Sequence, residues 1–396
     1  MKNPKDQKAK HGSNAKKSLE KLLQYCKKQN YILDYQGEYR IGKKGFSNSE
    51  QFYAAFIVRF ADEEWILYST TTMRSDRVKG QQWDSLQLKE INSSIKKSYL
   101  VYPDEVKKKD KEDFIRQNEK YLSGYEYSVI DGIINQEEFY NMVESKATGH
   151  LNVGQVKDIQ GRNFEDRVAE ILSSKENIKK WKSSDQSLVG LHFHIFDTIA
   201  SELQLKSGEV QEIIATANKK EIGVLPTGGS PKTDVIVLAN LNNGEQNEYS
   251  ISCKRTSKKG VSVHEYAAEK FSRVLDGEND ELRKLLVKFQ ETPTLSGFGE
   301  ENGERLTKEL STYNKKLALW VLGGIGGDGD PGTQWASHLL AYDNNNNNIS
   351  IHSIERYYEL LKSKNIKGNF GTFFSWTYPS KRRGKSIQLK CKMIQD

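Results

Sequence analysis

The chain has 396 residues, enough for two domains, and its composition excludes a disordered protein. Hydrophobic residues make up 36% and aromatic residues 10% of it, so the chain has the material for a core. Lys and Arg outnumber Asp and Glu by 60 to 53, and the resulting net charge of +7 suits a polyanionic partner such as nucleic acid.

Three features that the sequence lacks narrow the class of protein. The N-terminus is basic but lacks the apolar stretch of a signal peptide, and no apolar run reaches the roughly 18 residues of a membrane helix. The cysteines Cys26, Cys253 and Cys391 lie far apart, without the spacing of a zinc site or a disulfide framework. We therefore expect a cytoplasmic protein with reduced thiols and no membrane partner.

The N-terminal part reads as a mixed α+β domain. Residues 1–18 are rich in Lys, Asn and Ser and predict a mobile segment, followed by a helical pattern at 19–26. Aromatic and β-branched runs between 50 and 103 predict strands, and the charge-dense segment 103–120 predicts a solvated helix. We place the domain boundary near residue 150, so that residues 1–150 form one domain, with a role in DNA recognition or dimerisation open, and residues 151–396 the other.

The second part reads as an α/β domain with a mixed sheet. Phe164, Val168, Ile171 and Leu172 predict a helix with one buried face. A second helix is expected at 191–204, strands at 233–240 and 248–255, and helical periodicity at 263–290. The apolar run 317–324 predicts a buried strand, a Gly-rich flexible loop follows at 323–334, and two strands joined by an Asn-rich turn cover 337–354.

The hairpin between the strands 233–240 and 248–255 carries the residues that indicate chemistry. Asp234 begins the first strand and Lys254 ends the second, so antiparallel pairing would bring both side chains together. Ser252 shares the face of Lys254, while Cys253 points away and offers its backbone carbonyl. A carboxylate and a carbonyl oxygen are suited to bind a magnesium ion. With a lysine nearby, such a site is suited to cut a phosphodiester.

Four stretches together resemble the MspI-type restriction endonucleases, a branch of the PD-(D/E)xK nuclease fold. They are GRNFEDRVAEIL, TGGSPKTDVIV, ISCKRTSKKGVSVHEY and NFGTFFSWTYPSKRRGKSIQLK, in the family's order over residues 160–394. The resemblance does not cover residues 1–150. It implies a PD-(D/E)xK restriction-endonuclease-like catalytic domain, to which the patterns in residues 1–150 add an N-terminal α+β domain.

The resemblance also assigns catalytic roles to particular positions. Asp234 matches the metal-binding aspartate and Lys254 the catalytic lysine, while Ser252 stands where the family has Asn. A neutral hydroxyl is a poor ligand for Mg²⁺, so we expect Asp234 and the Cys253 carbonyl to hold the metal. Glu165, on the opening helix, is expected to support this site.

DNA contacts are expected from two further regions. By the resemblance, base contacts are expected from Ser262, Thr377, Ser380, Gln388 and Lys390. Contacts to the DNA backbone are expected from Arg255, Lys258, Lys259, Lys381, Arg382 and Arg383, and Lys232 is also expected to bind DNA. Because Lys commonly contacts guanine, Lys390 favours a short GC-containing site such as CCGG.

Three functions stay open at this point. The first is a type II restriction endonuclease, monomeric or homodimeric, that cuts double-stranded DNA with Mg²⁺ and is matched by a separate DNA methyltransferase. The second is a modification-dependent nuclease in which residues 1–150 recognise an altered base, and the third is a DNA-binding protein that does not cut. Arg74, Arg77 and Lys79 could contact DNA or only decorate the fold, and His192 with His194 predicts core histidines rather than a metal site.

Overall fold

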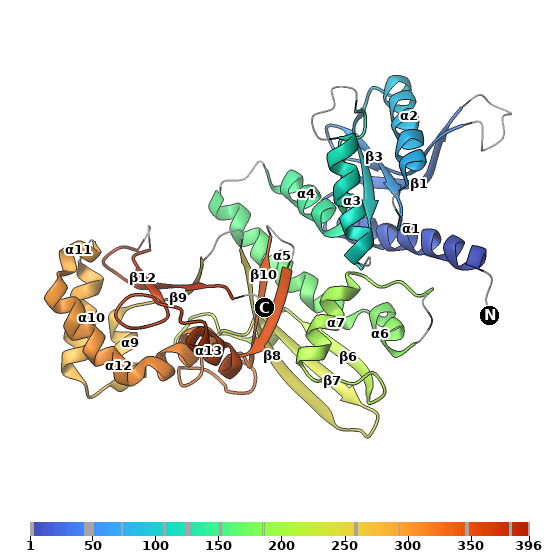
Figure 1. Ribbon diagram of the computed structural model, residues 1–396. Coiled ribbons are helices and arrows are strands. Elements are labelled where there is room, and N and C mark those ends of the chain that lie inside the picture. The colour runs from blue at the N-terminus through green and yellow to red at the C-terminus, as the bar shows by residue number, and fades with distance from the viewer. Residues whose placement is uncertain are drawn as a thin grey trace. The chain divides into compact units, whose positions relative to one another are not determined.

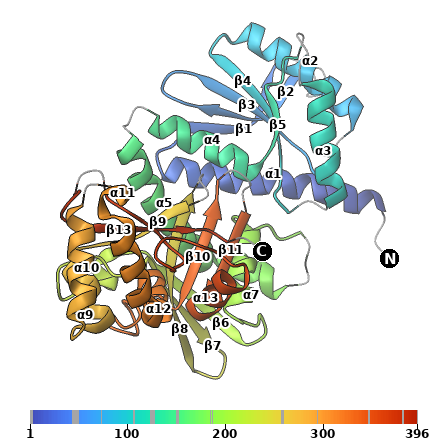
Figure 2. The same ribbon diagram turned by 60° about the vertical axis from the view of Figure 1, so that its left-hand side comes forward.

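The computed structural model divides the chain into two compact units, shown in Figures 1 and 2. The N-terminal unit comprises Met1–Val156 and Ser174–Phe196, and the C-terminal unit comprises Lys157–Ser173 and Asp197–Asp396. The structure describes residues 4–42, 51–72, 74–105, 108–122, 128–149, 153–183, 185, 187–256, 260–292, 294–344, 348–379 and 382–394.

A five-stranded sheet of order β1-β2-β3-β4-β5 forms the centre of the N-terminal unit. The pairs β1–β2 and β2–β3 are antiparallel, and β3–β4 and β4–β5 are parallel. The strands are β1 (Asp34–Ile41), β2 (Phe52–Arg59), β3 (Glu64–Ser69), β4 (Ile95–Tyr102) and β5 (Gly132–Asn135). The helices are α1 (Pro4–Lys28), α2 (Ser75–Ile91), α3 (Lys108–Tyr121), α4 (Gln136–Thr148) and α6 (Lys175–Lys182).

Helices cover both faces of this sheet. Buried side chains of α1 and α4 pack on one face, beside Phe56 and Trp65, and those of α2 and α3 pack on the other, beside Ile57 and Tyr68. The strands predicted between 50 and 103 are confirmed as β2, β3 and β4. The expectation of a mobile segment at 1–18 is wrong for the described residues, because α1 already begins at Pro4.

The C-terminal unit contains a five-stranded sheet of order β11-β10-β8-β7-β6 and a three-stranded sheet of order β12-β13-β9. The strands are β6 (Val210–Thr216), β7 (Val235–Leu241), β8 (Gln246–Thr256), β9 (Gly260–Tyr266), β10 (His338–Asp343), β11 (Asn348–Ser353), β12 (Ser375–Thr377) and β13 (Ile387–Lys392). The larger sheet is mixed, since β8 pairs antiparallel with β7 and parallel with β10. This confirms the predicted mixed α/β class.

Helices of the C-terminal unit fill the space around these sheets. Two of them, α5 (Val153–Ser173) and α7 (Phe193–Glu202), begin in the N-terminal unit. The others are α8 (Lys219–Ile222), α9 (Ala268–Asp276), α10 (Asp280–Glu291), α11 (Leu295–Phe298), α12 (Glu300–Gly323) and α13 (Ile354–Ser363). The largest core joins α9, α10, α12 and α13 to the small sheet through residues such as Phe271, Trp320 and Trp376.

The prediction of a strand at 317–324 is wrong, because this run forms the last turns of α12. Leu317, Ala318, Trp320, Val321 and Leu322 are all buried there. A helix buried on every side shows no polar face, so its sequence has the same continuous apolar run as a buried strand. The strand pair predicted over 337–354 is confirmed as β10 and β11.

Candidate active site

The β7–β8 hairpin places Asp234 against the end of β8, as the sequence predicted. The pairing opposes Val235 and Ile251, and the backbone N–H of Asp234 donates to the carbonyl of Ile251 at 2.8 Å. Asp234 therefore lies one residue before the paired part of β7. This register sets the carboxylate beside residues 252–254 of the central strand.

A single carboxylate oxygen of Asp234 collects three hydrogen bonds from β8. Its Oδ2 accepts from the backbone N–H of Cys253 at 2.8 Å, from the Lys254 ammonium at 3.1 Å and from the Ser252 hydroxyl at 3.3 Å. The hydroxyl of Ser252 thus donates to the aspartate, and its residue is fully buried. This contact orients Asp234, a role that matches a neutral side chain at this position.

The donor set at this end of β8 fits a hard cation. Besides Asp234, the Lys254 ammonium also donates to the backbone carbonyl of Cys253, at 2.8 Å. One positively charged group is therefore shared by a carboxylate oxygen and a carbonyl oxygen, the ligand types that Mg²⁺ prefers. The Cys253 thiol takes no part, because it is buried and burial raises its pKa well above the ordinary value.

Glu165 and a second lysine complete the cluster. Lys219 Nζ lies 2.9 Å from Glu165 Oε2 and 3.7 Å from Asp234 Oδ1. Burial and the nearby Asp234 raise the pKa of Glu165. Burial alone would lower the pKa of Lys219, but the Asp234 and Glu165 carboxylates outweigh it and raise that pKa. The structure therefore brings Glu165 into the predicted site.

Lys219 was missed by the sequence analysis. It begins α8, a short helix whose N-cap is Asn218, and the side chain of Asn218 accepts from the N–H of Lys220. This cap indicates a helix start but not that the helix lies beside Asp234. Because the contact depends on packing between distant segments, no local pattern announces it.

Replacing Lys219 by methionine should move the acid limb of the pH–rate profile to higher pH. Without this ammonium the ionised form of Glu165 loses a partner, so its pKa rises further and protonation begins at higher pH. We expect about tenfold slower DNA cleavage on the acid limb of the profile and at most about a twofold loss on its alkaline side.

The matched control is Lys220→Met, which removes an exposed lysine from the same helix. Initial cleavage rates across pH at saturating metal measure both variants. An unchanged acid limb in Lys219→Met would contradict the proposed support of Glu165.

Lys232, expected to contact DNA, points its ammonium at the protein backbone. Its Nζ donates to the carbonyl of Val263 on β9. Burial, with the neighbouring Lys254 charge, lowers the pKa of Lys232 to about 7. Arg255 is also held by the protein, since its Nε donates to Asn344 Oδ1 at 2.7 Å. DNA contact by these two residues stays a prediction.

Four of the residues expected to read bases lie on paired strands of the small sheet. Lys390 on β13 pairs with Ser262 on β9, and Gln388 on β13 pairs with Thr377 on β12. Gln388 and Lys390 are two apart on one strand, which favours one shared face, although a register irregularity lies between Leu389 and Lys390. Lys258, Lys259, Ser380 and Lys381 lie outside the described residues. Arg382 and Arg383 are exposed.

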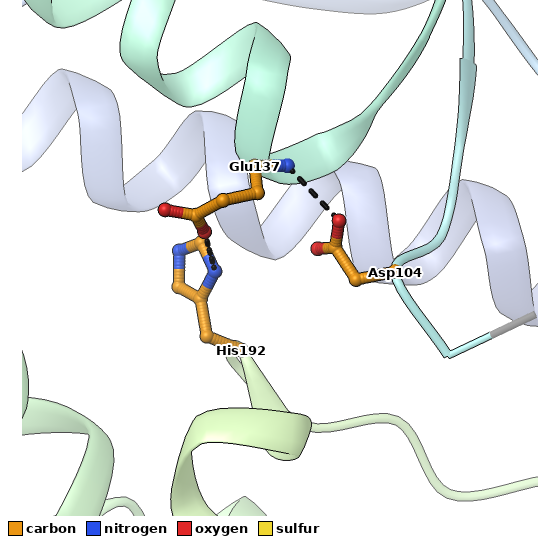
Figure 3. Close-up of side chains that lie close together, drawn as sticks. All are labelled: Asp104, Glu137 and His192. Atoms are coloured by element: carbon orange, nitrogen blue, oxygen red, sulfur yellow. Dashed lines mark hydrogen bonds and ion pairs between the residues drawn. The ribbon is translucent and has the colours of Figure 1, made fainter. Parts of the chain in front are cut away.

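The N-terminal unit holds a separate cluster, formed by Asp104, Glu137 and His192 (Figure 3). The ring Nδ1 of His192 lies 3.2 Å from Glu137 Oε2, and the N–H of Glu137 donates to Asp104 Oδ1 at 3.2 Å. His192 and Glu137 are buried, as expected for a core histidine. These contacts tie the start of α4 to the start of α7 and supply a structural reason for all three residues.

The Gly-rich segment 323–334, expected to be a flexible loop, contains Asp328, which forms ion pairs and a hydrogen bond with other segments. Asp328 accepts from the Thr227 hydroxyl at 3.0 Å and pairs with Lys270 and with Arg273.

None of the helices among the described residues has the length and apolar character that crossing a membrane requires.

A mixed sheet with carboxylates and lysines gathered at a strand end is suited to phosphodiester cleavage, and comparison with known proteins gives the family. The family model described as restriction endonuclease MspI matches residues 140–391, more than half of the chain. The chain therefore belongs to this family of type II restriction endonucleases. This confirms the expected family and enzyme class.

Two characterised relatives share long stretches with the chain. The type II restriction enzyme BsuFI of Bacillus subtilis is 29% identical over 370 residues, covering 87% of this chain and 88% of that protein. The type II restriction enzyme MspI of Moraxella sp is 25% identical over 248 residues, covering 61% of this chain and 92% of that protein.

A solved structure supports the fold. The crystal structure of restriction endonuclease MspI in complex with its cognate DNA superposes with a TM-score of 0.53 at 24% identity. The match covers 64% of this chain and 98% of that chain.

Proposed function

We propose that this protein cuts double-stranded DNA at a short GC-containing sequence, related to CCGG, by Mg²⁺-dependent hydrolysis. The observation that carries this proposal is the convergence of Ser252, the Cys253 N–H and Lys254 on one oxygen of Asp234. The relative whose crystal structure contains cognate DNA supports double-stranded DNA as the substrate. We propose residues 1–150 as an accessory domain to this activity.

In the proposed reaction, Asp234 and the Cys253 carbonyl would hold the metal, and Glu165 would support them. Bound Mg²⁺ would neutralise the scissile phosphate and lower the pKa of a coordinated water. Lys254 would release the oxygens that it now bridges and donate to the charge that develops on the phosphate. Ser252 would keep Asp234 oriented, and Lys219 would keep Glu165 ionised.

We propose that the three-stranded sheet of the C-terminal unit recognises the DNA sequence. Ser262, Thr377, Gln388 and Lys390 bring hydroxyl, amide and ammonium groups to paired strands, and these groups match the donors and acceptors of a major groove. We propose that exposed Arg382 and Arg383 contact backbone phosphates.

Lys390→Ala is expected to relax the choice of sequence more than it lowers the rate of cutting. Losing one specific guanine contact should cost roughly 1–3 kcal/mol of discrimination, or about ten- to a hundredfold in relative kcat/KM. Competitive cleavage of the best site and its single-base variants measures this ratio. Lys362→Ala, which removes an exposed lysine from α13, is the control. Equal losses on all sites would instead make Lys390 a phosphate contact.

The cellular setting follows from this activity. A nuclease that cuts a short sequence needs host sites to be protected, so we propose a separate DNA methyltransferase as its functional partner. The three cysteines are free thiols, which supports action in the reducing cytoplasm. We propose a monomer or a homodimer as the acting form.

Digestion of unmethylated phage DNA by the purified protein tests the proposal. We expect discrete fragments with Mg²⁺, none with EDTA, and fragment ends that map to one short GC-containing sequence. Methylating that sequence in a parallel sample should block cutting. Cutting of methylated DNA alone would replace the proposal with a modification-dependent nuclease, and binding without cutting in both samples would overturn it.

A further inference from the structure

The N-terminal unit contains a cavity of about 360 Å³ between α1, β2, β3 and α2. This volume falls within the range of pockets that hold small organic ligands. All the lining residues belong to the N-terminal unit, so the cavity is a feature of that unit alone. It lies outside the residues matched by the endonuclease family model.

Aromatic side chains and small residues shape the cavity. Tyr53 and Ala55 of β2 and Tyr68 of β3 supply aromatic and apolar surface. Across from these strands α2 contributes Gly80, where an added Cβ would meet nothing within 4 Å. A glycine inside a helix is less favourable than alanine, so the space that Gly80 leaves has a cost in helix stability. The aromatic lining offers a surface on which a flat ring can pack.

The polar lining of the cavity offers hydrogen bonds that the protein does not use. Within the described residues, Ser69 Oγ and Gln81 Oε1 are buried and have no hydrogen-bond partner. Such buried polar atoms without a partner are rare, because leaving them unpaired costs stability. Asp84, also in the lining, is half-buried, and burial raises the pKa of its carboxyl. A ligand rich in N–H donors would satisfy these acceptors.

Cationic donors lie in the same lining. Arg77 of α2 lines the cavity and donates to the Thr70 hydroxyl, and Lys16 of α1 pairs with Glu38. The cavity thus presents acceptors and donors beside an aromatic wall. Amino and carbonyl groups around a flat ring are the features of a nucleobase edge, which such a set of groups can read.

The surface beside the cavity suits a nucleic-acid strand. Trp83 follows Gly80 by about one helical turn and is 58% exposed, which is unusual for so large an aromatic side chain. Lys79, also exposed, lies next to Gly80. An exposed indole offers a stacking surface to a base, and the lysine offers a cation to a phosphate.

From this combination we propose that the cavity binds one nucleobase bearing an exocyclic amino group, held against Tyr53 and Tyr68 by Ser69, Gln81 and Asp84. The base can come from a free nucleotide or from a DNA strand that extrudes it. Extrusion is least costly for a mispaired base, which makes such a base a useful probe. This assigns the N-terminal unit a binding function apart from the cutting of DNA.

Filling the cavity from Gly80 tests this assignment on the full-length protein. Gly80→Leu would extend a side chain into the space, while Gly80→Ala adds only the Cβ that the structure accommodates. Neither should lower the melting temperature, because both residues favour a helix more than glycine does. EDTA is kept in all samples, so that the outcome does not depend on nuclease activity.

Two probes distinguish the sources of the base. The first is dAMP or dCMP, titrated into the protein and measured by isothermal titration calorimetry. The second is fluorescence anisotropy of a labelled 30-base-pair duplex with a single mispaired adenine, compared with its fully paired counterpart. Wild type and Gly80→Ala should bind the nucleotide, or should bind the mispaired duplex at least fivefold more tightly than the paired one, or both. Gly80→Leu should bind the nucleotide at least tenfold more weakly. It should also lose the fivefold preference for the mispaired duplex.

Each result decides the proposal. Binding of dAMP or dCMP that Gly80→Leu abolishes supports a site open to free nucleotides, and a mispair preference that the same variant abolishes supports an extruded base. No nucleotide binding together with no mispair preference in the wild type overturns the proposal. So does binding that Gly80→Leu leaves unchanged. The isosteric Asp84→Asn should weaken the same binding at least threefold while leaving the paired duplex unaffected.

Discussion

Replacing Asp234 by asparagine, or Lys254 by methionine, is expected to lower the rate of DNA cleavage by at least about 10³-fold. Asparagine keeps the shape of the side chain but removes the charge that would hold a divalent cation. Methionine keeps the apolar stem of Lys254 but removes the only group that bridges Asp234 and the Cys253 carbonyl among the described residues. Single-turnover cleavage of a defined duplex measures both losses.

Two matched controls separate this effect from general charge changes. Lys206→Met removes an exposed lysine that pairs only with Glu209 in the described contacts, and Asp280→Asn removes an exposed aspartate at the start of α10. Both should keep at least about half of the wild-type rate, because exposed pairs of this kind contribute little. Retained activity in Asp234→Asn or Lys254→Met would move the active site elsewhere in the C-terminal unit.

The largest expected effect on stability comes from Trp376→Ala. Trp376 on β12 is fully buried, its indole N–H donates to the Thr372 hydroxyl at 3.0 Å, and its ring lies 5.6 Å from Phe271 and 5.8 Å from Phe289. Truncation leaves a cavity and removes the hydrogen bond from the indole to the Thr372 hydroxyl, which keeps its bond to the Asn369 carbonyl, so the free energy of unfolding should fall by about 3–5 kcal/mol.

Urea denaturation, followed by circular dichroism, measures this loss. Because the two units have separate cores, only the transition of the C-terminal unit should move. Val224→Ala, which shortens a side chain that is 72% exposed in the same unit, should change the unfolding free energy by less than about 0.5 kcal/mol. A similarly small change in Trp376→Ala would show that the site repacks around the missing ring.

The sequence predicted most successfully where contacts are local. Asp234 and Lys254 sit on consecutive strands joined by a short turn, so their pairing follows from the hairpin pattern. The helix that carries Glu165 shows its buried face as a periodic apolar stripe, and the structure confirms it as α5. Strand alternation likewise anticipated that Ser252 and Lys254 both reach Asp234.

Contacts between distant segments account for what the sequence did not reveal. Lys219 reaches Asp234 only because α8 packs beside the hairpin, and nothing near residue 219 signals it. The cavity beside Gly80 is built from four elements that have no common motif. The apolar run at 317–324 was misassigned because burial on every side erases the periodicity that distinguishes a helix from a strand.

The backbone contacts of Cys253 determine what amino-acid substitutions at this position can reveal. Its N–H binds Asp234 and its carbonyl binds Lys254, while its thiol lies in the core on the opposite side of the strand. An alanine scan would therefore score this position as a packing site and miss the role that we propose for its backbone carbonyl, because truncation leaves both backbone groups intact. Packing in the core limits the residue type here, and only a backbone substitution, such as an ester in place of the amide, would test the proposed role of the position.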